Sequence, residues 1–129
     1  MATQFSEVIK SFHSTFADKI EIPDSLELMW LKKSVAAYGV EIAPIEYDEV
    51  LAEFSTDLNQ YTIDTLGFMM KVMYLERHYS KVNKIASIVG KDLSINGQGN
   101  LSKYAEDELA KTQTALEDRL SNLKPTAYN

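Results

Sequence analysis

Histidine is the side chain most often used for acid–base chemistry and metal binding near neutral pH, and it occurs only as His13 and His78. A di-iron site in a helical bundle needs a glutamate three residues before each histidine, but those positions hold Lys10 and Leu75. The zinc motif with two histidines on one helix is absent, and the chain contains no cysteine. We therefore predict no metal site and no cofactor. Both histidines are expected at the surface or at an interface.

Carboxylate pairs are a second common device for acid–base catalysis, and Glu46, Asp48 and Glu49 are clustered in the sequence. They lie in a polar, turn-rich segment, which favours solvation over catalysis. A GxG segment beginning at Gly97 lacks the third glycine of the dinucleotide-binding fingerprint and follows a helical pattern. We predict no catalytic residue and expect a protein that is not an enzyme. A small enzyme that uses the acidic cluster or a histidine is a third-ranked alternative.

The charged residues are unevenly distributed along a chain whose net charge of −6 argues against nucleic-acid binding as the main activity. Residues 34–70 contain no Lys or Arg and seven acids. Five of these acids form what we call the acidic region: Glu46, Asp48, Glu49, Glu53 and Asp57. Four cations at helical spacing form what we call the basic stripe: Arg77, Lys81, Lys84 and Lys91. Either both are merely solvated faces, or they are complementary surfaces between copies of the chain.

Apolar residues recurring at helical spacing predict an all-α fold, a single domain over residues 1–129 built as a small bundle of about four helices. The expected helices cover residues 3–17, 24–38, 58–88 and 101–123. A short additional helix is predicted over residues 47–54, with Val50, Leu51 and Phe54 facing inward. Asp24 and Asp57 are predicted to cap the second and third helices, and Gly39 and Gly90 to end them.

A glycine-containing loop is predicted between the third and fourth helices, over residues 92–100. Asn96-Gly97 is typical of a tight turn, and Leu93 and Ile95 alternate with polar neighbours as in a strand. This strand-like tip either packs on its own chain or pairs with another. Pro125 prevents the last helix from continuing, so a flexible C-terminal tail is expected.

Three segments together resemble the head–tail connector, or adaptor, proteins of long-tailed bacteriophages. They are Leu31-Lys32-Lys33 followed by Val35 and Tyr38, then MKVMYLERHYSKVNKIASIVGKDLSINGQG, then a charged helix ending in LSNLKPTAYN. The resemblance covers roughly residues 26–129. The N-terminal helix lies outside it, and within it the acidic link over residues 41–57 does not align.

The resemblance implies a non-enzymatic virion protein, which forms a ring of usually twelve copies beneath the portal and receives a stopper or tail protein. Double-stranded DNA would pass through its lumen without specific binding. The portal-docking tail would comprise Lys124, Pro125, Thr126, Ala127, Tyr128 and Asn129. A contact loop between subunits or rings would comprise Asp92, Leu93, Ile95, Gly97 and Gly99.

The expected location is the neck of the virion, and the host bacterial cytoplasm during assembly. Neither a signal peptide nor an apolar run long enough to cross a membrane is visible, so no membrane association is expected. The alternative function, of another class, is a small helical regulatory protein that binds a host or phage partner in the cytoplasm.

Overall fold

The computed structural model describes residues 2–16, 21–89 and 96–123, and the side chains within them except for residues 82–89 and 96–102. Within these ranges the elements follow in the order α1 (Phe5–Ser14), α2 (Asp24–Glu41), β1 (Tyr47–Asp48), β2 (Glu53–Phe54), α3 (Gln60–Val89) and α4 (Asn96–Leu123). The prediction of a small all-α bundle with about four helices is confirmed.

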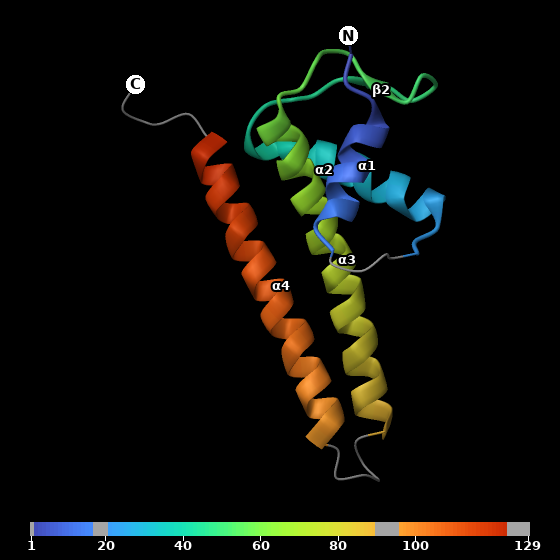
Figure 1. The fold of residues 1–129 in the computed structure, drawn as a ribbon, viewed down its shortest axis with the longest axis vertical. Coiled ribbons are helices and arrows are strands. Elements are labelled where there is room, and N and C mark those ends of the chain that lie inside the picture. Colours follow the sequence, from blue (N-terminus) through green and yellow to red (C-terminus); the bar gives the residue numbers. More distant parts are fainter. Residues whose placement is uncertain (1, 17–20, 90–95, 124–129) are drawn as a thin grey trace.

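The two longest helices, α3 and α4, run antiparallel and make the most extensive helix pair in the molecule (Figure 1). Both α1 and α2 pack on the N-terminal half of α3, whereas the C-terminal half of α3 and the start of α4 extend beyond them as a helical hairpin (Figure 1). The protein therefore has a thick end, which contains the core, and a thin end made of two helices.

The core lies where α1, α2 and α3 meet. The largest fully buried side chains include Phe12, Leu31, Leu66 and Met70, at the helical spacing that the sequence predicts. Around Phe12 the aromatic rings meet edge to face, with centroids 5.4 Å from Phe16 and 6.3 Å from Trp30.

Helices α1 and α3 approach closely at Gly67. A Cβ atom at this position would lie 2.9 Å from Ser11 Oγ and 3.1 Å from the backbone nitrogen of Phe12. The Ser11 hydroxyl donates a hydrogen bond of 2.7 Å to Asp64 Oδ1, one helical turn before Gly67. The glycine that interrupts the apolar run of α3 is therefore the point where α1 crosses it.

Helix α4 packs on the bundle through a narrow stripe of leucines. Leu116, Leu120 and Leu123 pack against the core, whereas Tyr104 is 69% exposed. Between these leucines, the Arg119 guanidinium lies 4.7 Å from the ring centroid of Tyr61 and 4.8 Å from that of Phe68. The cation of α4 thus stacks on two aromatic rings of α3.

The short helix predicted over residues 47–54 is wrong, because these residues form an antiparallel hairpin in which Tyr47 pairs with Phe54. Phe54 is fully buried, as expected, but Val50 and Leu51 are 93% and 61% exposed. Asp48 Oδ1 accepts hydrogen bonds from the amides of Val50 (2.9 Å) and Leu51 (3.1 Å). This side chain folds the backbone into a turn, which competes with the helix.

Residues 3–5, near the chain start, pair with the second strand of the hairpin and its preceding turn. The Phe54 amide donates to the Thr3 carbonyl at 2.7 Å, and the Phe5 amide donates to the Ala52 carbonyl at 2.9 Å. Ala52 has a positive φ of 52°, a left-handed conformation that a non-glycine residue rarely adopts. The hairpin is therefore held to the body of the protein by both backbone pairing and the burial of Phe54.

Several predicted helix ends are also wrong. Pro23, not Asp24, precedes the first turn of α2, and no side chain caps that helix. Helix α3 is capped by Asn59 instead of Asp57, since Asn59 Oδ1 accepts a 2.8 Å hydrogen bond from the Thr62 amide. Helix α2 continues through Gly39 to Glu41, where the Ile42 amide still bonds the carbonyl of Tyr38. A glycine inside a helix costs only about 1 kcal/mol, which burial on the same helix offsets.

Candidate functional site

Two of the four residues in the predicted basic stripe have described side chains, and both lie on α3. Arg77 and Lys81 are exposed and four residues apart, which places them on one face of the helix. Lys84 also belongs to α3, but its side chain lies outside the described part of the structure, as does Lys91 entirely. Neither Arg77 nor Lys81 forms an ion pair with a carboxylate of the described residues.

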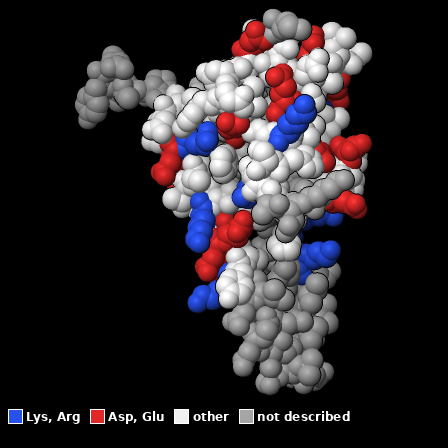
Figure 2. All heavy atoms as spheres, viewed as in Figure 1, with Lys and Arg blue, Asp and Glu red and all other residues white. Residues whose placement is uncertain are grey.

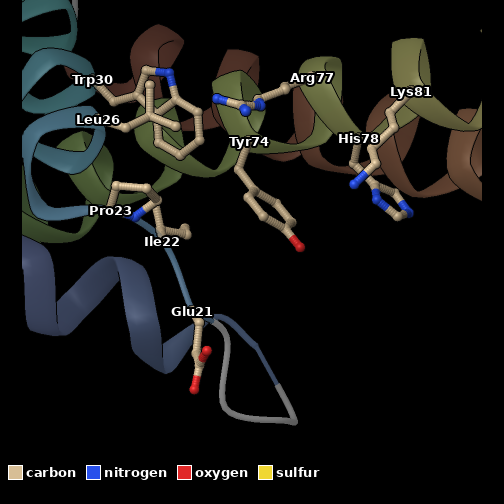
Figure 3. Close-up of a pocket in the computed structure, with 9 residues that line it drawn as sticks. All are labelled: Glu21, Ile22, Pro23, Leu26, Trp30, Tyr74, Arg77, His78 and Lys81. Atoms are coloured by element: carbon tan, nitrogen blue, oxygen red, sulfur yellow. The ribbon is translucent and has the colours of Figure 1, made fainter.

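A pocket of about 220 Å³ lies beside these two cations, between the start of α2 and the middle of α3. Figure 3 shows Tyr74, His78 and Lys81 projecting from α3 on one side, with Glu21 on the other. The remaining lining side chains are mainly apolar and come from the start of α2 and the residues before it: Ile22, Pro23, Leu26 and Trp30. The pocket thus combines an apolar wall with a charged rim, on which Arg77 and Lys81 lie on α3 and the carboxylate of Glu21 lies opposite them.

The aromatic wall of the pocket is continuous with the core. The Tyr74 ring stands nearly perpendicular to Trp30, with centroids 6.2 Å apart, and contacts Phe16 at 5.0 Å. On its other side it stacks parallel to the imidazole of His78 at 6.1 Å. Since Trp30 is 6% exposed and packed among other core residues, this wall is preformed.

The predicted acidic region is brought together by the hairpin. Glu46, Asp48, Glu49 and Glu53 lie in or directly beside its strands, and Asp57 follows β2 by three residues. Figure 2 shows that acidic side chains gather around the end of the molecule that carries the chain start. These residues therefore lie on different elements from the basic stripe, as two complementary surfaces require.

The acids of this region have different local roles. Glu49 pairs with Lys32 of α2, which ties the hairpin to that helix. The Asp48 carboxylate accepts the two turn amides described above. Glu46 and Asp57 line a second, open hollow of about 440 Å³ beside Tyr38. The acids of this region therefore serve different local contacts.

The two histidines have different surroundings. His13 Nε2 lies 3.1 Å from Glu27 Oε2, which joins α1 to α2, whereas His78 is exposed at the pocket rim. Across the described ranges, no three His, Asp or Glu side chains are grouped in a way that would hold a metal ion. Nor is any helix, over those same ranges, long and apolar enough to cross a membrane.

The contact loop and the tail lie largely outside the described residues. This holds for Asp92, Leu93 and Ile95 and for all six tail residues from Lys124 to Asn129. Gly97 and Gly99 belong to the first turns of α4, so the prediction that the loop extends to Asn100 is wrong. Helical hydrogen bonding that starts at Asn96 replaces the tight turn expected there.

Two features of this surface were missed by the sequence reasoning. The apolar pocket wall joins Trp30 and Tyr74, which are 44 positions apart, so no local pattern relates them. The exposed turn residues Val50 and Leu51 were interpreted as helical core residues. The signal that would have identified the turn is Asp48, since an aspartate often bonds the amide two residues further on.

Comparisons of the chain with models of known protein families, with characterised proteins and with solved structures found no match.

Proposed function

We propose that this protein is a non-enzymatic structural component of a phage virion, a connector that forms a ring beneath the portal and joins head to tail. The proposal places it at the neck of the particle, after assembly in the bacterial cytoplasm. Its partners are further copies of itself, the portal protein, and a stopper or tail protein. Double-stranded DNA passes through the ring without specific binding.

The observation that carries the proposal is the presence of two unlike surfaces on separate elements. A ring in which each copy contacts the next head to tail needs two different, complementary patches on each subunit. The hairpin presents acids, and α3 presents Arg77 and Lys81 without partners among the described residues. The sequence resemblance to connector proteins supports the same assignment, because it includes the basic stripe.

The shape of the molecule supports assembly rather than catalysis. The thin end formed by α3 and α4 projects beyond the core (Figure 1), and such a projection offers surface to neighbours without enclosing a reaction site. The pocket beside the basic stripe is open, and five of its nine lining residues have apolar or aromatic side chains that offer contact surface. Contact with other proteins is the use that these features fit best.

Electron microscopy with gold-labelled antibodies tests the proposal directly. Particles of the phage that encodes this chain would be purified and labelled, with an antibody to the major capsid protein as a positive control. We expect gold between head and tail, and mass spectrometry of the same particles should detect the chain. Label nowhere on the particle, with the capsid label intact, would contradict the connector function.

The second candidate is a regulatory protein that binds one host or phage partner in the cytoplasm. The exposed aliphatic residues Val50 and Leu51 favour it, because an apolar apex suits any protein partner. Such a protein forms a small complex of defined composition and is absent from finished particles. The labelling experiment separates the two candidates.

A further inference from the structure

The apex of the β-hairpin, which we call the hairpin tip, consists of Val50 and Leu51. Their exposed fractions are 93% and 61%, although both are aliphatic. Single exposed apolar residues are common, but two adjacent ones at the end of a projecting turn concentrate apolar surface. This surface is unused within the described chain.

The hairpin tip is held in a fixed conformation. Asp48 Oδ1 binds both amides of the tip, and the Ala52 amide donates to the Glu49 carbonyl at 3.3 Å. Directly after the tip, Ala52 is in the left-handed region, a conformation that is unfavourable for a residue other than glycine and persists only where its surroundings impose it. A preorganised turn loses little entropy when it binds, which favours a docking role.

The pocket between α2 and α3 has the complementary properties. Its volume of about 220 Å³ exceeds the roughly 150 Å³ of an apolar cavity that accommodates benzene, so it has room for aliphatic side chains. Leu26 and Trp30 supply apolar contact, and the two cations of the rim, Arg77 and Lys81, outnumber its one carboxylate, Glu21. An acidic segment with an apolar apex is the ligand that such a site fits.

We infer that the hairpin tip of one copy of this chain docks into the pocket between α2 and α3 of the next copy. Val50 and Leu51 contact the aromatic wall, while Glu49 and Glu53 face the cations of the rim. The surface pair between Glu49 and Lys32 does not prevent this contact, because exposed ion pairs are weak and exchange readily. The inference rests on the proposed function, which requires contacts between copies.

This contact links two different surfaces, so it is head to tail and propagates from copy to copy. Every subunit then uses its tip on one side and its pocket on the other. In this contact, two residues of the acidic region, Glu49 and Glu53, face Arg77 and Lys81 of the basic stripe. The apolar tip provides the anchor, and the charges set its orientation.

Cysteine cross-linking tests the inference, since the native chain has no cysteine. A Val50→Cys chain and a His78→Cys chain are mixed in equal amounts at high concentration and oxidised. His78 is exposed at the pocket rim and carries none of the proposed ionic contacts. The control replaces Val50→Cys by Val40→Cys, a residue that is 87% exposed at the C-terminal end of α2 and belongs neither to the tip nor to the lining of the pocket.

We expect the disulfide between Val50→Cys and His78→Cys to form in at least about tenfold higher yield than the control link, a difference of about 1.4 kcal/mol. It should also exceed both homodimeric links. Adding Arg77→Glu to the His78→Cys chain should lower the yield, and adding Glu53→Arg to the Val50→Cys chain should restore it. Equal yields for Val50→Cys and Val40→Cys would overturn the inference.

The outcome is distinguishable from failure of the proposed function. Gold label at the neck with no preferred cross-link would leave the connector in place and overturn the contact between tip and pocket. A preferred cross-link with no label on the particle would uphold the contact, in an oligomer with a different role, and remove the connector function.

Discussion

At Gly67, helices α1 and α3 lie too close together to accommodate even the methyl group of an alanine. We expect Gly67→Ala to lower the free energy of unfolding by about 1–2 kcal/mol, because overpacking against Ser11 outweighs the gain in helix propensity. Gly39 is the matched control, since its added Cβ would meet only Pro44 Cα at 3.6 Å. Gly39→Ala should raise the stability by about 0.5–1 kcal/mol. Urea denaturation measures both; equal effects of the two variants would contradict the close approach.

Helix caps illustrate which residue details the sequence could predict. Asp57 is the cap that the sequence predicts for α3, and asparagine is an equally good capping type. Asn59 Oδ1 accepts the Thr62 amide in the first turn, and the Thr3 hydroxyl at the chain start accepts the Leu58 amide at 2.8 Å. The choice between caps was set by that distant contact, which no local pattern contains.

The contact of α4 with α3 depends on Arg119, which lies against the rings of Tyr61 and Phe68. A double-mutant cycle with Arg119→Met and Phe68→Leu should give a coupling energy of about 0.5–2 kcal/mol, as expected for a cation stacked on a ring away from solvent. Chemical denaturation of the four proteins supplies the values. A coupling energy near zero would mean that the cation contributes nothing to the helix pair.

The hairpin has a buried residue, Phe54, and an exposed apex that includes Val50. Substitutions at the two positions should have different effects on stability. Phe54→Ala is expected to cost about 3–5 kcal/mol, since Phe54 is fully buried and lies 5.1 Å from the ring of Phe5. Val50→Ser should leave the stability within about 0.5 kcal/mol of the native value. Thermal unfolding followed by circular dichroism reports both. A large loss for Val50→Ser would show that the tip is packed on its own chain.

The four helices were predictable because their apolar residues repeat at the period of a helix, and these are the residues that the core buries. The hairpin was not, since Val50, Leu51 and Phe54 have the spacing of a helix face as well. What distinguishes the two structures is the pairing of the hairpin with residues 3–5, a contact across about fifty positions. The left-handed conformation of Ala52 could not be predicted either, because a sequence usually indicates that conformation by a glycine.

At the scale of the whole molecule, reversing the charge of the basic stripe should impair assembly without affecting folding. Lys81→Glu with Lys84→Glu is expected to leave the unfolding midpoint of the isolated protein nearly unchanged, since Lys81 is exposed and without an ion pair among described residues. Ring formation on the portal should weaken, because like charges would then meet. Lys103→Glu, an exposed cation of α4, is the control. Normal ring assembly by the double variant would exclude this stripe as an interface.

Deletion of residues 124–129 addresses the proposed portal-docking tail. Helix α4 ends at Leu123, so the truncation removes no residue of the described bundle and should not change the unfolding midpoint. Binding of the truncated ring to purified portal should be lost or reduced at least about tenfold. Gradient sedimentation of mixtures measures this. Portal binding equal to that of the full chain would remove the tail from the docking surface.

The backbone pairing of the chain start with the hairpin also affects the protein while it is being made. Helix α1 leaves the ribosome before the elements on which it packs, yet ten residues are too few for a stable isolated helix. Its partner Tyr74 follows roughly 60 residues later, a delay of about 3–12 s at ordinary rates of translation. During that interval the apolar side chains of α1, including Phe12, lack their contacts with α3. Chaperones that bind nascent chains should therefore engage the protein first at its N-terminus and leave once α3 has emerged.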